Sequence, residues 1–322
     1  MDAVSGTGSG LSRRTLLAGA VGVGVTALAG CSGGDDGYVI TAEVADDPED
    51  VERDWQPVAE WIEGKTGVET DIDAVGDASS AIGALATGQT DAAYLSGGPS
   101  WVGWNEHGFE TLAVEADDDG KTHYVAAAYT RSDTGIETMR DAEGVDSAHT
   151  GDLTGAGMLI PVASLVEDGL VSFDSTDDVT AIRDAVEEYF GNPIIGGGYI
   201  GALQALSEGQ ADIAFGRVDT PETYCGGDSA EPWCLDSEEY EIVREFTEVP
   251  SHPVLASTDT TEDERDQLED ALLALNGDAE GQEILEDVFG ISQLEPATAE
   301  SHLGPYGELI SNLPGIEDHL LE

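Results

Sequence analysis

Positive charge is scarce in this sequence. Lysine and arginine together number 11 among 322 residues, against 67 aspartates and glutamates, and the formal net charge is −56 at pH 7. Proteins that bind nucleic acid or anionic lipid headgroups need a basic face, so this composition excludes both as partners. Such acidity is typical of haloarchaeal proteins, because at molar salt the Debye length is roughly 3 Å and self-repulsion is screened. We expect most carboxylates to cover a hydrated surface.

Long apolar runs are scarce too. The run at 16–29 is shorter than the roughly 20 helical residues that cross a bilayer. It follows Arg13-Arg14, a twin-arginine export signal, and it ends in Leu28-Ala29-Gly30-Cys31, which resembles a lipoprotein processing site. We expect removal of residues 1–30, lipidation of Cys31 and anchoring to the outer face of the cell membrane. Cleavage removes one aspartate and two arginines, which leaves 66 acidic and nine basic residues.

Only three cysteines are present. With Cys31 lipidated, Cys225 and Cys234 remain, and an exported chain can hold them as a disulfide around a short loop. Zinc is the competing interpretation, but neither a CxxC motif nor a histidine pair accompanies them. The six histidines, at 107, 123, 149, 252, 302 and 319, form no i,i+4 pair. We therefore predict the disulfide and no metal site.

Catalytic signatures are missing as well. The sequence contains no GxSxG, HExxH or P-loop motif. Gly196, Gly198 and Gly201 match the dinucleotide pattern GxGxxG, and Asp219 follows at nearly the spacing of a ribose-binding acid. However, the match is not in the first βαβ position, and nicotinamide cofactors are scarce outside cells. We expect neither an enzyme nor a cofactor.

Strand-like and helix-like segments alternate along the chain, which is typical of an α/β protein. About 290 mature residues exceed one usual hydrophobic core, so we expect two lobes after a polar tether at 31–37. The predicted strands are 38–44, 68–75, 91–95, within 110–117 and 123–130, 145–149, 193–196 and 211–215. The predicted helices are 47–67, 78–87, 99–107, 155–168, 180–190, 199–208, one after a capping box of Thr261 and Glu264, and two around 278–288 and 304–312.

The segment 151–161, GDLTGAGMLIP, begins an apolar helix with very small residues. The first N–H groups of a helix lack helical partners and carry partial positive charge, so anions bind there readily. Gly155-Ala156-Gly157 would let a ligand approach these N–H groups, and Thr154 would add a hydroxyl donor. The alternative is that Thr154 or Asp152 is simply the helix N-cap. Composition alone does not decide between the two.

A similar phrase occurs in both halves of the chain. Residues 81–95 and 199–215 each read as a helix, then Gly, Gln, Asp and a strand. This suggests similar lobes on both sides of a cleft, which is a common small-molecule site. The candidate ligand contacts at its edges are Ser96, Trp101 and Asp219. The alternatives are that the tryptophan packs inside its lobe and that Asp219 is an ordinary surface carboxylate.

The order of these segments resembles the phosphate, phosphite and phosphonate-type solute-binding proteins of ABC importers. Residues 47–67 resemble the family's opening helix, and 76–104 its first ligand-side segment. Residues 152–170 resemble the segment in which a Ser-Thr-Ser-Gly turn binds the anion, and 196–215 the next ligand-side helix. The resemblance implies a two-lobed periplasmic-binding fold of type II, with a mixed sheet flanked by helices in each lobe.

Several positions depart from the family's pattern. Thr154-Gly155-Ala156-Gly157 lacks two hydroxyls of the Ser-Thr-Ser-Gly turn, and the family's Asp-Tyr start is Asp77-Ala78 here. Tyr199 occupies a common histidine position, and Ile200 replaces an acid that holds an amine in some members. A 2-aminoethylphosphonate-like substrate is therefore disfavoured, whereas phosphate, phosphite, another organic anion or a non-phosphorus solute stay open. Asp77 is retained as a ligand-binding candidate. The resemblance also implies Tyr94 and Tyr199 as contacts, because their hydroxyls suit anion oxygens.

We predict one lobe from 38–128 plus 250–322 and another from 129–249, with crossings near 129–131 and 249–251. The chain is expected to be a monomeric, extracytoplasmic component that captures a small oxyanion and delivers it to an ABC permease. With so few cations, neutral N–H and hydroxyl donors would hold the anion. The alternatives are a lipid-anchored sensor or scaffold that binds a non-phosphorus solute or none, and an exported hydrolase.

Overall fold

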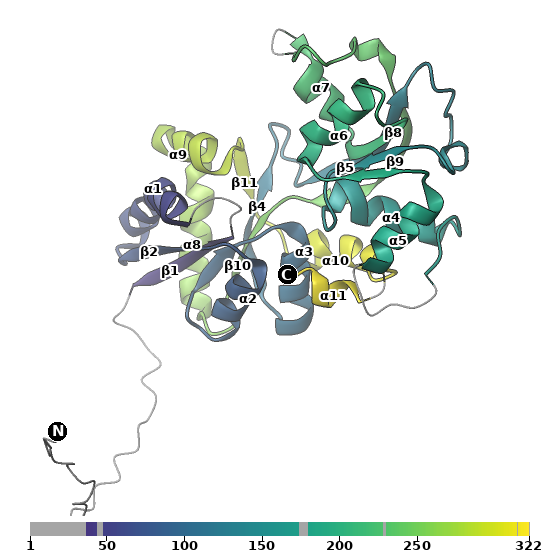
Figure 1. Ribbon diagram of the computed structural model, residues 1–322. Helices are drawn as coiled ribbons and strands as arrows, with labels where there is room; N and C mark the ends of the chain where they lie inside the picture. The colour runs from purple at the N-terminus through teal and green to yellow at the C-terminus, as the bar shows by residue number, and fades with distance from the viewer. Residues whose placement is uncertain (1–36, 44–47, 174–179, 228–229, 314, 322) are drawn as a thin grey trace, which may run out of the picture. The chain divides into compact units, whose positions relative to one another are not determined.

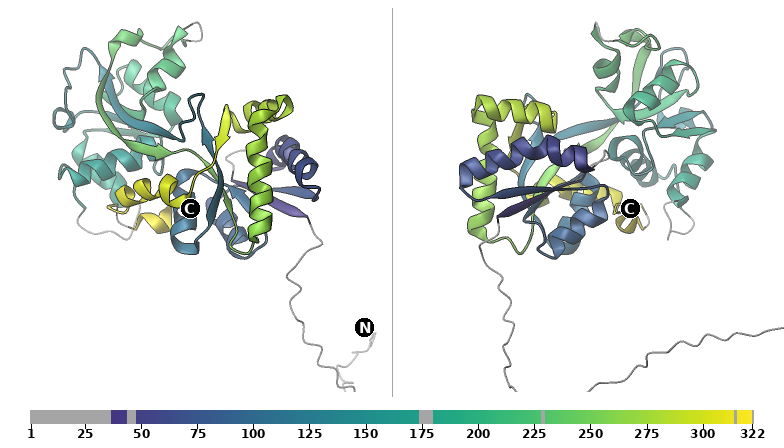
Figure 2. Two further views of the ribbon diagram at one scale, coloured as in Figure 1. Left: turned by 180° about the vertical axis from the view of Figure 1, so that it is seen from behind. Right: turned by 60° about the vertical axis from the view of Figure 1, so that its left-hand side comes forward.

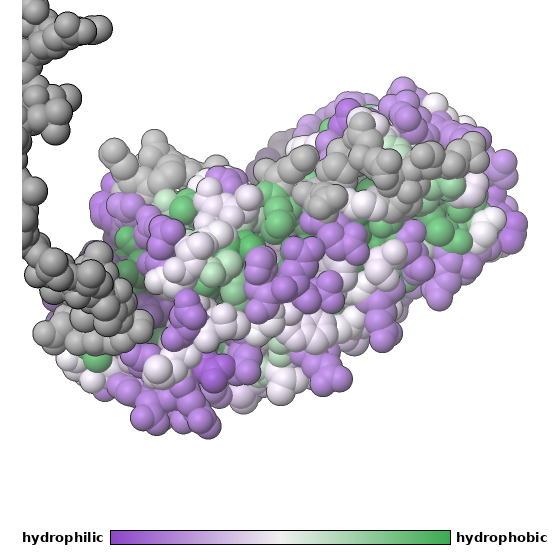
Figure 3. Space-filling model, turned by 90° about the horizontal axis from the view of Figure 1, so that it is seen from below, coloured by the Kyte–Doolittle hydropathy of each residue, from purple (hydrophilic) through white to green (hydrophobic). Residues whose placement is uncertain are grey.

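The computed structural model describes residues 37–43, 48–173, 180–227, 230–313 and 315–321. Two β-sheets with flanking helices form two lobes (Figures 1 and 2), which confirms the predicted α/β class with a mixed sheet in each lobe. Hydrophilic residues predominate on the face shown in Figure 3, with hydrophobic patches between them. None of the helices in these ranges combines the length and the apolar character that crossing a bilayer requires.

The first lobe is built on a six-stranded sheet. Its strands are β1 (Tyr38–Glu43), β2 (Thr70–Val75), β3 (Ala92–Tyr94), β4 (Glu110–Ala116), β10 (Pro253–Ala256) and β11 (Gln293–Glu295). Its helical segments are α1 (Pro48–Thr66), α2 (Ala78–Ala86), α3 (Gly97–Val102), η1 (Gly103–His107), α8 (Glu262–Leu273), η6 (Ala274–Gly277), α9 (Ala279–Ile284) and η7 (Leu285–Phe289). The order is β11-β4-β10-β3-β1-β2. β1 is parallel to β2 and β3, whereas β10 is antiparallel to β3 and β4.

Helices cover both faces of this sheet because the crossovers β1-α1-β2 and β2-α2-β3 run in opposite directions along it. α1 buries Trp55, Val58 and Ile62, which share one helix face. Its Trp61 Nε1 donates a hydrogen bond to the Ala271 carbonyl of α8 at 2.8 Å. α2 buries Leu85 in a separate cluster, and Figure 1 shows α1 and α2 on different sides of the strands.

The second lobe is built on a five-stranded sheet. Its strands are β5 (His123–Arg131), β6 (Ser147–His149), β7 (Pro193–Ile195), β8 (Ile213–Arg217) and β9 (Tyr240–Pro250). Its helical segments are η2 (Met139–Ala142), η3 (Gly155–Leu159), α4 (Ile160–Glu167), α5 (Thr180–Tyr189), α6 (Gly198–Ser207), α7 (Thr220–Cys225) and η5 (Ser237–Glu239). The order is β7-β6-β8-β5-β9. β6 is parallel to β7 and β8, and β5 is antiparallel to β8 and β9.

The chain changes sheets twice. Residues 117–122 connect β4 to β5, and residues 251–252 connect β9 to β10. The first change comes earlier than the predicted 129–131, because β5 pairs with β9 from His123 onward and Arg131 lies opposite Tyr240. The second change, at 251–252, adjoins the crossing predicted near 249–251.

The C-terminal helices pack against both lobes. α10 (Ala299–Ile310) contacts α3 of the first lobe as well as α4 and β9 of the second, and α11 (Ile316–His319) follows it. Tyr306 and Ile310 share one buried cluster with Trp101 of α3. Residues beyond the second sheet change therefore contribute to the wall between the lobes.

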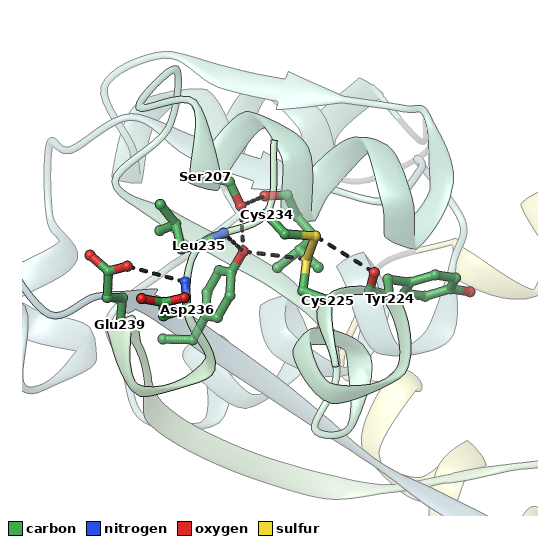
Figure 4. Close-up of a disulfide and its surroundings, with 9 residues drawn as sticks. Ser207, Tyr224, Cys225, Cys234, Leu235, Asp236 and Glu239 are labelled. Atoms are coloured by element: carbon green, nitrogen blue, oxygen red, sulfur yellow. Dashed lines mark hydrogen bonds between the residues drawn. A yellow bond between two sulfur atoms is a disulfide. The ribbon is translucent and has the colours of Figure 1, made fainter. Parts of the chain in front are cut away.

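Cys225 and Cys234 form a disulfide, as predicted from the sequence. Figure 4 shows the bridge at the end of α7. The Tyr240 hydroxyl lies 3.5 Å from Cys225 Sγ. That hydroxyl lies 2.6 Å from Ser207 Oγ of α6 and accepts a hydrogen bond from Leu235 N at 3.1 Å. The bridge and Tyr240 together join the loop after α7 to α6 and β9.

Candidate functional site

A cavity of about 250 Å³ lies where the two lobes, the second sheet change and α10 meet. Its lining residues are Ser96, Gly97, Gly98, Pro99, Tyr124, Leu153, Thr154, Gly155, Tyr199, Val249, Pro250, His252 and Tyr306. Among these described residues there is no Lys, Arg, Asp or Glu. The polar groups that face the cavity are therefore phenols, hydroxyls, an imidazole and backbone amides.

A larger hollow of about 780 Å³ lies at the start of α10. Its lining includes the carboxylates of Glu110, Glu269 and Glu300, which would repel an anion. Only the smaller cavity is lined by the segment 153–155, the predicted anion-binding helix start. The smaller cavity is therefore the candidate site.

In the second lobe, a helix begins at the cavity wall. Thr154 is its N-cap, with φ −73° and ψ 131°, and η3 starts at Gly155. The first helical bonds run from Met158 N and Leu159 N to the Thr154 carbonyl, both at 3.0 Å. The N–H groups of residues 155–157 precede these bonds, so they are the donors that a helix start leaves to a ligand.

The small residues of this helix start serve two different purposes. A Cβ at Gly155 would lie 2.9 Å from Val249 Cγ1 at the cavity wall, whereas a Cβ at Gly157 would lie 1.8 Å from Thr150 Oγ1. Ala156 and Gly157 are buried and do not line the cavity. Gly155 thus keeps the cavity open, and Gly157 is required by the packing of the preceding loop.

The first lobe presents a second helix start to the same cavity. α3 begins after its N-cap Ser96, and Gly97 and Gly98 line the wall. A Cβ at Gly98 would lie 3.5 Å from the Tyr306 hydroxyl, and a Cβ at Gly155 would lie 4.0 Å from it. The Tyr306 hydroxyl therefore lies between the two helix starts.

The Thr154 hydroxyl is already engaged within its own loop. Its Oγ1 lies 2.6 Å from Thr150 Oγ1 and donates to the Gly151 carbonyl at 3.0 Å. Since a hydroxyl has one proton, Thr150 must be the donor in the shorter contact. Thr154 therefore shapes the turn before the helix, and its hydroxyl reaches a ligand only if it releases Gly151.

Tyr124 and Tyr199 bring two phenols into the cavity. Burial raises the pKa of both phenols, and the nearby Arg217 guanidinium acts in the opposite direction. Arg217 lies 4.7 Å from the centre of the Tyr124 ring and forms an ion pair of 2.8 Å with Asp219. Asp219 is thus the partner of an arginine behind the cavity wall.

His252 lies in the second sheet change and lines the cavity, and its imidazole is held by a contact with Tyr94 of the first lobe. Its Nδ1 lies 2.9 Å from the Tyr94 hydroxyl, which also donates to Glu115. The Tyr94 ring packs against Trp55 and Phe289 inside the first lobe. Tyr94 therefore orients the imidazole without lining the cavity itself.

The structure brings together four of the residues proposed from the sequence: Ser96, Thr154, Gly155 and Tyr199 line the cavity. The remaining candidates lie elsewhere. Asp77 is the exposed N-cap of α2, where its carboxylate accepts from Ser80 N at 2.7 Å, a bond that lowers its pKa. Trp101 is only 5% exposed and packs beside Gly307 of α10. Cys31 lies outside the described residues.

Three polar side chains of the cavity were missed in the sequence: Tyr124, His252 and Tyr306. Tyr124 lies near the start of a predicted strand, and His252 follows the predicted crossing at 249–251. The sequence position of each residue therefore indicated a place in the cavity only weakly. Nothing local distinguishes Tyr306, because it lies in an amphipathic helix where a buried aromatic is ordinary.

Comparison with known proteins identifies relatives of two kinds. A family model described as "ABC transporter, phosphonate, periplasmic substrate-binding protein" matches residues 40–302. The phosphate-import protein PhnD of Mycolicibacterium smegmatis is 25% identical over 201 residues, which cover 58% of this chain and 60% of that protein. Human melanotransferrin is 27% identical over 220 residues, covering 53% of this chain and 30% of its own. The chain thus spans only part of these curated relatives.

A solved structure supports the fold. PhnD1 from Prochlorococcus marinus, in complex with methylphosphonate, superposes with a TM-score of 0.59 at 13% identity. The match covers 86% of this chain and 98% of that one.

Proposed function

This chain belongs to the phosphonate-type periplasmic substrate-binding proteins of ABC transporters, and on that premise we propose that it captures a small oxyanion for delivery to a membrane permease. Phosphate, phosphite and a small phosphonate are the proposed solutes. The oxyanion would bind in the 250 Å³ cavity between the start of α3 and the start of η3. We propose Ser96, Thr154, Gly155 and Tyr199 as its contacts, together with the N–H groups of Ala156 and Gly157.

One observation carries this proposal: two helix starts from opposite lobes open into one cavity whose described lining contains no charged side chain. Backbone N–H groups at helix starts stabilise oxyanions through fixed dipoles and short hydrogen bonds. Such bonds persist in concentrated salt, where charge–charge attraction is screened within a few ångströms. A site of this kind suits a chain with 11 basic and 67 acidic residues.

The proposed transport role also requires the ligand to favour one arrangement of the lobes. An anion that touches both helix starts makes its full set of contacts only when the lobes are close, so binding would favour the closed arrangement. The two connections, 117–122 and 251–252, are the places where the backbone would bend. The permease would then distinguish loaded from empty protein.

Calorimetric titration tests the proposal directly. The purified chain in molar KCl would be titrated with phosphate, phosphite and methylphosphonate, and with acetate as a non-phosphorus anion. We expect binding of one phosphorus oxyanion per chain, and a gain in unfolding free energy of about 2.7 kcal/mol at a ligand concentration of 100 Kd. Asp77→Asn should bind as the unmodified chain does, because Asp77 lies outside the cavity. Absence of any binding would favour the sensor or scaffold function instead.

We further propose that lipid on Cys31 anchors the chain to the outer face of the cell membrane. The support is the sequence Leu28-Ala29-Gly30-Cys31 after the Arg13-Arg14 pair. Expression of the full chain in a haloarchaeal host should yield a membrane-bound protein whose N-terminal peptide begins at a lipid-modified Cys31 by mass spectrometry. The Cys31→Ala variant should appear in the soluble extracellular fraction. An unmodified Cys31 in the membrane-bound protein would contradict the anchor.

A further inference from the structure

His252 lines the cavity and is fixed there by one carboxylate. Glu115 N of β4 donates to the His252 carbonyl at 3.0 Å, and His252 N donates to Glu115 Oε2 at 3.2 Å. The imidazole Nδ1 lies 2.9 Å from the Tyr94 hydroxyl and 3.7 Å from Glu115 Oε1. Since the Glu115 side chain is only 13% exposed, its carboxylate is a mostly buried negative charge beside the histidine ring.

These contacts determine which imidazole nitrogen carries the proton. The Tyr94 hydroxyl has one proton and donates it to Glu115. Nδ1 of His252 must therefore donate to the Tyr94 oxygen, which leaves a lone pair on Nε2 when the imidazole is neutral. Nε2 makes no hydrogen bond within the described part of the chain, so it is the nitrogen that remains for a ligand in the cavity.

A neutral His252 presents an unsuitable group to an oxyanion. The lone pair of Nε2 repels an anionic oxygen, whereas a protonated Nε2 donates a charge-assisted hydrogen bond to it. An imidazolium here would lie between two anions, the Glu115 carboxylate and the ligand, and both favour the charged form of the ring. Binding of an oxyanion should therefore draw a proton onto Nε2.

We propose that His252 takes up a proton at Nε2 when the oxyanion binds, and that it then adds a cationic contact to the neutral N–H donors of the site. The inference rests on the proposed function, because the oxyanion supplies the negative charge that stabilises the imidazolium. The proton comes from solvent and joins the Nε2 lone pair, while Nδ1 keeps its proton on the Tyr94 oxygen. Capture of the anion is thus stronger at lower pH.

Among the described residues around the cavity, His252 is the side chain that can supply positive charge near neutral pH. The described lining contains no Lys or Arg. Arg217, which lies near the Tyr124 ring, is neutralised by Asp219, whose carboxylate oxygens accept from Nε at 3.0 Å and from Nη2 at 2.8 Å. Burial raises the pKa of the phenols that line the cavity, so they stay neutral; these are Tyr124, Tyr199 and Tyr306.

Two further histidines lie close by, on α10 and β5, and neither opposes the charge on His252. His302 Nε2 donates to the Ser251 carbonyl at 2.8 Å. Burial lowers the pKa of His302 to about 4, and His123 and His252 add to this shift, so His302 stays neutral where histidines usually titrate. His123 Nε2 donates to the His302 carbonyl at 3.0 Å, and its Nδ1 lies 3.0 Å from Thr122 Oγ1, so both of its nitrogens are engaged outside the cavity lining.

Nitrogen NMR of the histidine rings provides the direct test. The purified chain, labelled with ¹⁵N in histidine, would be observed at about pH 7.5 without ligand and with methylphosphonate. The His252 signals would be assigned by their absence from His252→Gln or, if that variant does not melt cooperatively, from His252→Asn. We expect Nε2 to shift from the position of an unprotonated ring nitrogen to that of a protonated one when methylphosphonate binds. An Nε2 whose protonation does not change on loading would overturn the inference.

The pH dependence of affinity provides a second test with a matched control. Methylphosphonate would be titrated calorimetrically at about pH 6 and about pH 9 into the unmodified chain, His252→Gln and His107→Gln. Because glutamine cannot acquire charge, the ratio of the His252→Gln Kd to the unmodified Kd should be at least about tenfold larger at the lower pH. His107 is exposed in η1, outside the cavity lining, so His107→Gln should match the unmodified chain at both pH values. The ionisation of the ligand cancels from each ratio.

The outcomes separate this inference from the proposed function. A chain that binds methylphosphonate without a change in Nε2 protonation, or in which His252→Gln weakens binding equally at both pH values, would overturn the proton uptake and leave the oxyanion site intact. A chain that binds no phosphorus oxyanion at either pH would overturn the proposed function and the inference with it.

Discussion

The N–H group of Gly155 provides the most direct test of the proposed oxyanion site. Gly155 is the first residue of η3, and its N-cap Thr154 has the extended backbone that a following proline requires. Proline is well tolerated at the first helical position because the N–H there has no helical partner. Gly155→Pro should therefore remove one donor and leave the helix start in place.

The magnitude follows from comparison with Gly155→Ala. Both substitutions add a Cβ that would lie 2.9 Å from Val249 Cγ1, the end of a side chain that can move by a few tenths of an ångström. Alanine keeps the N–H, so the difference between the two variants isolates the donor. A hydrogen bond to a charged group contributes about 1.5–3 kcal/mol, which corresponds to about a 10- to 150-fold difference in Kd.

Calorimetric titration of both variants with the same oxyanion provides the measurement. The two variants should melt within a few degrees of each other, which would confirm that the helix start is retained. Equal affinities for the oxyanion in Gly155→Pro and Gly155→Ala would refute the reasoning, because the N–H of residue 155 would then make no bond to the ligand.

Three further predictions concern stability. Gly157→Ala should lower the unfolding free energy by about 3 kcal/mol, the upper end for overpacking, since its Cβ would lie 1.8 Å from Thr150 Oγ1. In denaturant melts, the same substitution made in the Thr150→Ala variant should lower the unfolding free energy by less. An equal loss in both backgrounds would contradict the clash. Replacing Cys225 and Cys234 by serine should cost about 2–3 kcal/mol through loop entropy and leave oxyanion affinity unchanged in titration; an unaltered melt would contradict this. Burial lowers the pKa of His149 to about 4, below its unfolded value of about 6.5. The unfolding free energy should therefore decline by about 3 kcal/mol as the pH falls from 6.5 through 4. In His149→Asn, denaturant melts measured across that window should show a weaker pH dependence of the unfolding free energy, and an unchanged pH profile would contradict the assignment.

The elements that sequence reasoning predicted are those whose burial follows a local period. α1 was predicted from Trp55, Val58 and Ile62, and these residues are buried together. β9 was missed, because most of its residues are exposed or half-buried and its acidic sequence shows no apolar alternation. It forms a strand through its long pairing with β5, and that pairing is a tertiary property.

The cavity residues also divide into those predicted from a local motif and those that only the fold brings together. The helix start after Thr154 and the tyrosine at the start of α6 were predicted because each belongs to one short motif. Tyr124, His252 and Tyr306 lie on β5, the second sheet change and α10, and only the fold brings them together. Tyr94 illustrates the converse: its position in the sequence suggested a ligand contact, but its hydroxyl is bound to Glu115 and His252.

The glycines of the 154–157 turn show why a motif alone could not settle the chemistry. Sequence comparison treats Gly155 and Gly157 as equivalent small residues, yet one faces the cavity and the other contacts Thr150. Loss of the family's turn hydroxyls is partly offset, because Thr150 and Thr154 bond to each other and fix the turn. The N–H groups of residues 155–157 can therefore keep one direction without the family's turn hydroxyls. In a chain this acidic, a fixed set of neutral donors would suit the proposed oxyanion by geometry rather than by charge.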